Sequence, residues 1–394
     1  MSELSYLEKL LDGAEVEWFP LDAVAKIKHG KDWKGLGEGT VPVYGSGGIM
    51  GYVDKYSYDK PTVLIPRKGT ITNVFYVDTP FWNVDTIYYT DIEISKVLPK
   101  YFYHFIKTID LMALDTGSGR PSLTQAILNR LLIPIPCPDN PEKSLAIQSE
   151  IVRILDKFTA LTAELTAELT MRKKQYNYYR DQLLSFDDDE VEWKTLGEIG
   201  TWHGGGTPSK SRSEFWEDGS IPWISPKDMG RPIVDTSEDY ITEEAVEQSS
   251  TKLVPANSIA IVVRSSILDK VMPSALIPVP ATFNQDMKVV IPHCNISPNY
   301  IAHIMRSRGD DILRAAKKSG GSVASIDSKK LFSFRIPVPH LNEQKRIVNI
   351  LDKFDTLANS ITEGLPREIE LRQKQYEYYR DLLFSFPRPE TASN

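Results

Sequence analysis

The sequence predicts an α+β protein in which two similar globular domains are separated by two long antiparallel helices. Three observations lead to this prediction. The chain has 394 residues, which is enough for two or three domains. Its second half repeats the plan of its first half. Each half also ends in a long segment whose apolar residues recur every three or four positions, which is the period of a helix.

The internal repeat is closest in the helical segments. IVRILDKF at 151–158 recurs as IVNILDKF at 347–354, and RKKQYNYYRDQLLSF at 172–186 recurs as RQKQYEYYRDLLFSF at 372–386. An Ile-Pro-x-Pro tetrapeptide precedes each copy. The N-terminal YLEKLLDGAEVEW also resembles YRDQLLSFDDDEVEW, which begins in the first of these segments. We therefore expect a pseudo-two-fold repeat with a circular organisation, in which the two chain ends lie close together.

The globular parts are predicted at 1–143 and 187–342. Short β-rich runs such as TVLIP at 62–66 and KVVIP at 288–292 alternate there with Gly, Ser, Pro and Asp, the pattern of short strands and turns. Short helices are expected after Pro99 and Pro298. Each globular part is therefore expected to be a mixed α+β domain.

The first long helix is predicted at 144–186, where apolar residues form a stripe typical of a coiled coil. At 1.5 Å per residue it would be roughly 60 Å long, so it needs a partner helix. The partner is predicted at 343–386. Gly364 and Pro366 should break it near 362–367 into pieces at about 343–362 and 367–385. Residues 387–394 form a tail.

A tandem repeat, TAELTAEL, lies inside the first helix and interrupts its heptad spacing. Four residues are close to one helical turn, so each unit adds length with little rotation. We interpret the segment as a spacer cassette that sets the length of the helix. It consists of Thr162, Ala163, Glu164, Leu165, Thr166, Ala167, Glu168 and Leu169.

Composition argues against several classes of protein. No apolar run approaches the length of a membrane span, and the N-terminus carries no apolar core of a secretory signal, so the cytoplasm is expected. Cys137 and Cys294 lack the spacing of a metal site and are interpreted as incidental thiols. The formal net charge of −7 argues against a surface that is basic all over, but allows a local basic face.

Motifs for catalysis are missing from the sequence. The glycine clusters lack the spacing of a phosphate-binding or dinucleotide-binding loop, and no adenine-methyltransferase motif of the NPPY type occurs. Asp269, Asp286 and Lys288 resemble a nuclease triplet only by a spacing that arises by chance. His104 and His303 occupy equivalent repeat positions and are expected to be structural. We predict no catalytic residues and no metal site.

Other residues suit binding. In each half a hydrophobic strand ends in an arginine, Arg67 or Arg264, whose forked guanidinium can engage a phosphate or a guanine edge. The alternative is that each arginine pairs with a nearby acid, Asp85 or Asp286. A loop rich in Gly, Ser and basic residues precedes each Ile-Pro-x-Pro strand and could present N–H groups and hydroxyls to phosphates.

The chain resembles the specificity (S) subunit of type I restriction-modification systems, and its TAEL repeat resembles that of the IC-like subclass. The match includes IPVPHLNEQKRIVNILDKFD at 336–355 and the first copy around Gln148. GGGTPSKSRSEFWEDGSIPWISPKDM at 204–229 and VPVYGSGGIMGY at 41–52 are similar to the openings of two classes of target-recognition domain. The resemblance covers almost the whole chain.

The resemblance implies a non-catalytic subunit in which each globular domain reads one half of a bipartite, asymmetric site in double-stranded DNA. The helices would set the spacer between the half-sites and dock two modification (M) subunits. Restriction (R) subunits would join this M/S core. The chain itself would bind no cofactor, because S-adenosylmethionine belongs to M, and ATP and Mg²⁺ belong to R. A protein- or RNA-binding adaptor and a self-contained DNA enzyme are the alternatives.

We expect DNA contacts from basic, hydroxyl and tyrosine side chains near the loops described above. These residues are Lys31, Lys34, Tyr44, Ser46, Arg67, Lys68, Thr70, Ser118, Arg120, Ser122, Thr207, Ser209, Lys210, Lys227, Arg264, Ser265, Ser266, Lys317, Lys318 and Ser322.

Overall fold

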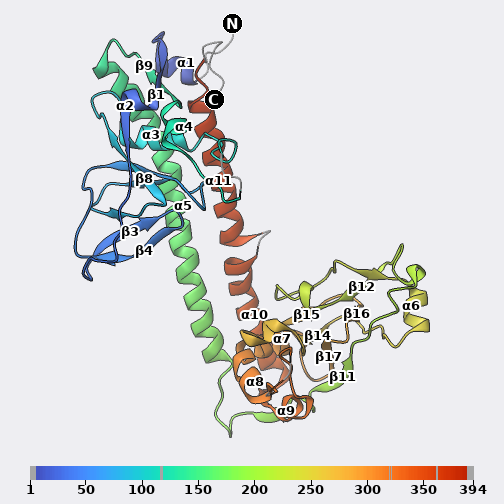
Figure 1. The fold of residues 1–394 in the computed structure, drawn as a ribbon. Helices are drawn as coiled ribbons and strands as arrows, with labels where there is room; N and C mark the ends of the chain where they lie inside the picture. The colour runs from blue at the N-terminus through green and yellow to red at the C-terminus, as the bar shows by residue number, and fades with distance from the viewer. Residues whose placement is uncertain (1–5, 116–118, 319, 321, 361–362, 388–394) are drawn as a thin grey trace. The chain divides into compact units, whose positions relative to one another are not determined.

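The computed structural model describes residues 6–115, 119–318, 320, 322–360 and 363–387 (Figure 1). The chain divides into two compact units, which we call unit 1 (Met1–Thr166 with Glu368–Asn394) and unit 2 (Ala167–Arg367). Both units mix helices with sheets, as the sequence predicts. The division also assigns part of the helical region to each unit, because the helices contribute residues to both hydrophobic cores.

Unit 1 contains a globular domain followed by the first part of the longest helix. Its elements are α1 (Tyr6–Leu11), β1 (Val16–Pro20), α2 (Leu21–Val24), β2 (Ala25–Lys28), β3 (Val41–Gly45), β4 (Gly48–Val53), β5 (Thr62–Pro66), β6 (Phe75–Val77), β7 (Trp82–Asn83), β8 (Ile87–Ile92), α3 (Pro99–Ile106), α4 (Gln125–Asn129), β9 (Leu132–Pro136), the start of α5 (Pro141–Leu183) and most of α11 (Gly364–Leu383).

Unit 2 follows the same plan. After the end of α5 come β10 (Glu192–Thr195), β11 (Gly200–Gly204), β12 (Ile221–Ile224), β13 (Tyr240–Ile241), α6 (Glu243–Gln248), β14 (Ser258–Val262), β15 (Ser274–Ile277), β16 (Thr282–Phe283), β17 (Met287–Pro292), α7 (Pro298–Ser307), α8 (Gly309–Ala316), α9 (Ser328–Ser333), β18 (Arg335–Val338) and α10 (Leu341–Asn359), with short 3-10 turns at Ser213–Phe215, Pro226–Asp228 and Ser266–Asp269.

The strand order of the two units is the same. The larger sheets run β2-β8-β5-β6 and β11-β17-β14-β15, the smaller sheets run β4-β3-β7 and β13-β12-β16, and β1-β9 matches β10-β18. In each smaller sheet the middle strand pairs antiparallel with one neighbour and parallel with the other. The repeat seen in the sequence is therefore confirmed at the level of topology, including the stretches whose sequences diverge.

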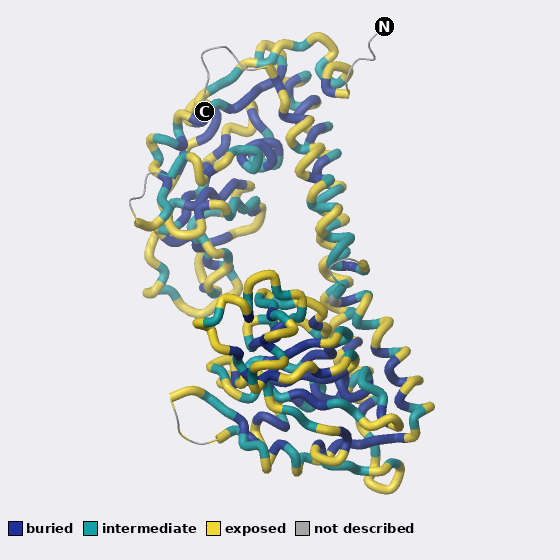
Figure 2. The backbone as a smooth tube through the Cα atoms, turned by 90° about the vertical axis from the view of Figure 1, so that its right-hand side faces the viewer, coloured by how far each residue is buried: buried dark blue, intermediate teal, exposed yellow. Residues whose placement is uncertain are grey.

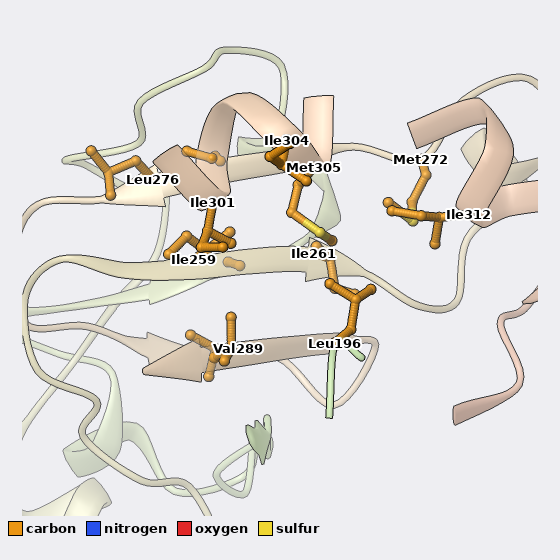
Figure 3. Packing of buried hydrophobic residues seen from close by; sticks show 14 of the residues in the cluster. Leu196, Ile259, Ile261, Met272, Leu276, Val289, Ile301, Ile304, Met305 and Ile312 are labelled. Carbon is orange, nitrogen blue, oxygen red and sulfur yellow. The ribbon is translucent and has the colours of Figure 1, made fainter. Parts of the chain in front are cut away.

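The core of unit 2 lies between its larger sheet and α7. Figure 3 shows Ile301, Ile304 and Met305 of α7 on one side of β14, whose Ile259 and Ile261 are fully buried. Val289 belongs to β17, which is paired beside β14 in the same sheet. All five residues of β14 and of β5 are buried, so both faces of each strand are covered, which explains the uninterrupted runs SIAIV and TVLIP.

Buried polar side chains connect each globular domain to the long helices. The Gln148 side chain accepts from the Leu98 N–H at 2.8 Å and donates to the Lys96 carbonyl at 2.9 Å. The Gln344 side chain likewise accepts from the Ser297 N–H at 2.8 Å, and it donates to the Pro339 carbonyl. These contacts explain the glutamine in the helical motif.

A buried tyrosine explains the Ile-Pro-x-Pro motif. The Tyr101 hydroxyl donates to the Pro134 carbonyl at 2.8 Å, and the Tyr300 hydroxyl donates to the Pro337 carbonyl at 3.0 Å. Both tyrosines are completely buried. Each hydroxyl thus joins the first turn of α3 or α7 to the strand that leads into a long helix.

The helices pair within each unit. In unit 1, α11 runs antiparallel to the first part of α5 (Figure 1), and Phe158 stacks on Tyr379 with ring centroids 5.1 Å apart. In unit 2, Tyr179 stacks on Phe354 at 5.6 Å. Observed helix bounds are Leu341–Asn359 and Gly364–Leu383, two to three residues earlier than expected.

The break before α11 involves Gly364, whose φ is +76°. A Cβ there would lie 2.5 Å from the Thr356 carbonyl oxygen, so only glycine fits. Pro366 lies inside the first turn of α11, where its missing N–H costs nothing, whereas it could not continue an unbroken helix from α10.

The spacer cassette lies inside α5 but contributes to neither hydrophobic core. Leu165 and Leu169 are half-buried, whereas Leu161 is 37% exposed, so the predicted apolar stripe is interrupted there. Figure 2 shows long helices with many exposed and intermediate residues and buried segments inside the globular parts. The hydroxyls of Thr162 and Thr166 donate to the carbonyls of Phe158 and Thr162. A deletion within the cassette would therefore remove no core residue.

Both ends of the described chain belong to unit 1. Trp18 donates its indole N–H to the Pro387 carbonyl at 2.8 Å, and Leu7 shares a core with Phe384 and Phe386. The circular organisation predicted from the N-terminal similarity is therefore present.

A buried histidine joins α3 to the helix pair in unit 1. His104 Nε2 lies 3.1 Å from Asp156 Oδ1, and its Nδ1 lies 2.9 Å from the Tyr376 hydroxyl. Since an ionised carboxylate only accepts, Nε2 carries the proton and Nδ1 accepts from Tyr376. Lys100 also donates to Asp156, at 2.6 Å. Burial lowers the pKa of His104. These contacts give His104 a structural role, as expected.

We predict that Gln148→Ala destabilises unit 1 and Gln344→Ala destabilises unit 2, each by about 1–3 kcal/mol, because a buried N–H and a buried carbonyl lose their partners. Hydrogen exchange at the amides of α3 and α7 measures the two effects separately. The exposed Lys157→Ala serves as the control, and protection in α3 that is the same in Gln148→Ala and wild type would contradict the prediction.

We also predict that unit 1 loses stability as the pH falls below about 6.5, the ordinary pKa of histidine. The unfolded chain then takes up a proton that buried His104 resists, so the free energy of unfolding falls. The slope of α3 protection against pH between about 5 and 7 measures this, and His104→Gln should flatten it. An unchanged slope in the variant would assign the dependence to other groups.

Candidate nucleic-acid interface

In unit 1 the residues after β5 fold against the turn before β8. The N–H groups of Arg67 and Lys68 both donate to the Thr86 carbonyl, at 2.9 and 3.2 Å. Gly69, with φ +85°, turns the chain and donates to the Pro121 carbonyl at 3.1 Å, and Leu123 N–H donates to the Arg67 carbonyl at 2.9 Å. The two loops that the sequence singles out separately therefore lie side by side.

The turn between β3 and β4 joins the same group of loops. Ser46 N–H lies 3.3 Å from Thr86 Oγ1, to which it donates, and Asn73 Nδ2 donates to the Ser46 carbonyl at 3.2 Å. Lys68 pairs with Ser122 in an isolated β-bridge, and the Ser122 N–H donates to Asp115 Oδ1. We call Ser46, Arg67–Thr70 and Arg120–Leu123 the unit 1 loop cluster.

Unit 2 builds an equivalent group. Arg264 bridges to Ser325, Ser265 N–H donates to the Ala324 carbonyl at 3.0 Å, and Lys318 N–H donates to the Ser325 carbonyl at 2.9 Å. Helix caps end the basic loops of both units, since Thr124 accepts from Ile127 N–H and Asp327 from the N–H groups of α9. We call Arg264–Ser266, Lys317–Lys318 and Ser322–Ile326 the unit 2 loop cluster.

The acid-pairing alternative fits one arginine better than the other. Arg67 Nη1 lies 3.3 Å from the Asp85 carbonyl oxygen but 3.9 Å from its carboxylate, and Asp85 is largely exposed. Such a pair is weak in water. The Arg264 guanidinium is exposed and has no hydrogen bond or ion pair within the described parts of the chain, so pairing with Asp286 is wrong. Both arginines are therefore available to a ligand.

Two of the proposed basic contacts are already neutralised. Lys227 lies 2.8 Å from Glu238 and 3.0 Å from Asp239, and hydrogen bonds to these carboxylates raise its pKa. Lys317 lies 2.9 Å from Asp269. Lys68 and Lys318 are exposed in their clusters, as is Arg120.

Tyr44 is a half-buried residue of β3. Its ring packs 5.8 Å from that of Phe75 and 6.1 Å from that of Phe81, and burial raises its pKa. Its contact with DNA stays a prediction. Ser118 lies outside the described residues, while Thr70, Ser266 and Ser322 are exposed.

The remaining predicted residues lie beside the smaller sheets and not in the clusters. Lys31 is held by its backbone to Asn83 and Trp82. Lys34 follows Asp32, whose carboxylate accepts from the Lys34 N–H. In unit 2 the loop after β11 carries Thr207, which bonds to Gln285, with Ser209 and exposed Lys210 next to it.

Glycine lets these loops approach the sheets. A Cβ on Gly30 would lie 2.1 Å from the Val84 carbonyl oxygen, and one on Gly205 would lie 1.9 Å from the Asn284 oxygen. Neither contact is possible for another residue, so the loops after β2 and β11 are held at matching places in the two units.

Sequence reasoning missed three exposed apolar residues in the hairpin of β3 and β4. Ile49, Met50 and Tyr52 are 51%, 58% and 55% exposed. The signal was present in GGIMGY, where apolar residues follow a glycine turn without the alternation that a half-buried strand requires.

Neither a metal centre nor a membrane helix is found in the part of the chain that the structure describes. Within those residues, no group of three or more His, Cys, Asp or Glu side chains is arranged to hold a metal ion. The same residues form no helix that is long and apolar enough for a membrane span.

Comparison with known proteins identifies the family. The sequence matches the type I restriction modification DNA specificity domain twice, over residues 14–171 and 188–371. It is 66% identical over 409 aligned residues to the type I restriction enzyme EcoR124I/EcoR124II specificity subunit of Escherichia coli, with all of both chains covered. A putative specificity subunit of Haemophilus influenzae is 33% identical, with 97% of this chain and 98% of the relative covered.

Solved structures share the fold. The S subunit of a type I restriction-modification system from M. genitalium matches with a TM-score of 0.59 and 18% identity, covering 98% of this chain and 99% of that one. A chain from a structure of type I restriction-modification complex assembly matches with a TM-score of 0.61 and 13% identity, over 94% and 97% of the two chains. The repeated fold, the two domain matches and the full-length relative together show that this chain belongs to the family of type I restriction-modification specificity subunits.

Proposed function

We propose that this chain is the DNA-recognition subunit of a type I restriction-modification complex, without catalytic activity of its own, and that each unit reads one half of a bipartite DNA site. The observation that carries the proposal is the pair of loop clusters. Both units place an arginine and a basic, Gly- and Ser-containing loop at the same point of the same topology, yet with different residues. One scaffold with two sets of contact residues suits an asymmetric site.

The chemistry of the clusters fits this role. An arginine side chain can donate two hydrogen bonds to the major-groove edge of guanine, whereas backbone N–H groups and serine hydroxyls position phosphates. The Arg264 guanidinium has no partner within the described residues, whereas Arg67 donates to the Asp85 carbonyl oxygen and has a 3.9 Å, exposed contact with its carboxylate. DNA would therefore not have to break a strong ion pair at either arginine.

The spacing between half-sites is proposed to depend on α5. This single helix of 43 residues begins in unit 1 and ends in unit 2, and the cassette lies where it passes from one to the other. Each added TAEL unit would lengthen it by about 6 Å and rotate it by about 40°.

Two M subunits, each with S-adenosylmethionine, are proposed to dock on the helices, and R subunits with ATP and Mg²⁺ to join this core. Support comes from the near-identity of residues 172–186 and 372–386, which gives the two units equivalent helical surfaces. The net charge of −7 further suggests that the chain alone binds DNA weakly and needs M to close around the duplex. The cytoplasm is the proposed location.

A protein- or RNA-binding adaptor remains the second candidate on sequence grounds. It would use the same exposed loops but would not require base-specific contacts from arginine. The two functions therefore differ in what the arginines do.

We predict that Arg67→Ala and Arg264→Ala, in a complex assembled with M, each reduce methylation about 10- to 100-fold, the usual value of a bidentate base contact. Methylation rates on duplexes with single changes in either half-site measure this. Each variant should relax specificity in one half-site only, so each controls for the other. Arg67→Lys and Arg264→Lys keep the charge and lose the fork, and full activity in these variants would indicate phosphate contact alone. Unchanged methylation in the alanine variants would show that neither arginine contributes to DNA recognition, and no sequence-dependent methylation by the wild-type complex would favour the adaptor.

We further predict that a third TAEL unit inserted after Leu169 yields an active complex whose spacer is one or two base pairs longer, with unchanged half-sites. Sequencing of methylated bases in cells that carry the variant and its M partner measures both. The matched control is a two-residue insertion at the same point, which would rotate the following helix by about 200° and should abolish methylation. Altered half-sites in the TAEL variant would contradict the proposed role of α5.

A further inference from the structure

The hairpin of β3 and β4 in unit 1 exposes apolar side chains near its turn. Ile49 and Met50 are each more than half exposed. The ladder is irregular there, since Tyr44 pairs with Ile49 and Val43 pairs with Gly51, which leaves Met50 as the extra residue of a β-bulge. A hairpin that only covered a core would bury such residues. This end of the hairpin therefore projects beyond the core that holds it.

The projection is rigid. Val43 and Val53 are buried with Val84 at the base of the hairpin, and Trp33 packs against them. A Cβ on Gly51 would lie 3.0 Å from the Trp33 ring, and Gly48 has a φ of +112°, so glycines fix both the close approach and the turn. A fixed projection loses little conformational entropy when it enters a binding partner.

The apolar end is continuous with the unit 1 loop cluster. Ser46, in the turn of the hairpin, is held by Thr86 and Asn73, and a Cβ on Gly69 would lie 3.2 Å from Ser46 Oγ. Arg67 and Lys68 are thus next to the hairpin, whereas residues 44–53 carry no charge at all. An uncharged end beside basic residues suits contact with bases flanked by phosphate contacts.

We propose, resting on the function proposed above, that this hairpin enters the DNA major groove and that Ile49 and Met50 contact the C5-methyl group of thymine in the half-site read by unit 1. A two-stranded ribbon fits the major groove, which is about 12 Å wide, and not the minor groove of about 6 Å. The thymine methyl is the apolar group that the base edges present in the major groove. Ile49 and Met50 thereby determine specificity at one or more A·T pairs.

In unit 2 the matching connection is not a tight hairpin. Its corresponding strands, β12 and β13, are joined by residues 225–239 in place of a tight turn, and Lys227 in this connection is paired with Glu238 and Asp239. Sensitivity to the thymine methyl through these residues is therefore confined to the half-site of unit 1.

The test replaces thymine by uracil, which lacks only the methyl group, at each position of the unit 1 half-site. Binding of each duplex is measured with the complex of this chain and M. Loss of one buried methyl should weaken binding by the wild-type complex about 3- to 5-fold at one or more positions. In Ile49→Ala with Met50→Ala, thymine and uracil duplexes should bind equally, and both more weakly than the thymine duplex binds to wild type.

The matched control is Ile94→Ala, which removes an apolar side chain that is 64% exposed. Thr86 comes just before β8, whereas Ile94 comes after the other end of this strand. It should keep the full penalty for uracil. Uracil in the half-site of unit 2 should give the same ratio in the wild type and the double variant.

Three results would overturn the inference. They are a wild-type complex that tolerates uracil at every position, a double variant that keeps the wild-type penalty, and a double variant that no longer assembles with M, since the hairpin would then be a protein contact. The uracil series on the wild-type complex needs no variant and so does not depend on folding. If the complex requires no particular sequence at all, the proposed function itself fails, which is a different outcome from tolerance of uracil within a required sequence.

Discussion

The structure depends on how each recognition domain is fixed to its pair of helices. In both units a glutamine amide from the first turns of a long helix bonds to the backbone just before α3 or α7, and a tyrosine from α3 or α7 bonds to the strand that leads into that helix. These groups are buried, so their bonds are strongly favoured over any arrangement that leaves them unpaired. The loop clusters can occupy definite positions only because this joint has one geometry.

Much of the architecture could be predicted from the sequence, because the repeat and the helical period are strong signals. The break between α10 and α11 was predictable from Gly364, which has a backbone conformation that other residues avoid. Pro366 lies in the first turn of α11, a place where a proline can start a helix but cannot continue the preceding one. The apolar stripe was overestimated at Leu161, because periodicity alone does not show whether a partner residue faces each position.

The candidate site was predictable in part. Arg67 and Lys68 lie far from Ser122 in the sequence, and only the pairing of the loops around Thr86 brings them together. The sequence does not show that Lys227 has two carboxylate neighbours or that Tyr44 belongs to an aromatic cluster, because both depend on contacts made after folding. The exposed Ile49 and Met50 were missed for a different reason, since apolar residues in a strand are normally assigned to a core.

Unit 1 is built from both ends of the chain, and this has a consequence for synthesis on the ribosome. Unit 2 is one continuous segment, Ala167–Arg367, whereas unit 1 needs the residues that follow Glu368 to cover its core with Tyr376, Leu383 and Phe384. The recognition domain made first must therefore wait, with part of its apolar surface uncovered, until translation is nearly finished. The domain made second has all of its own segments before that point.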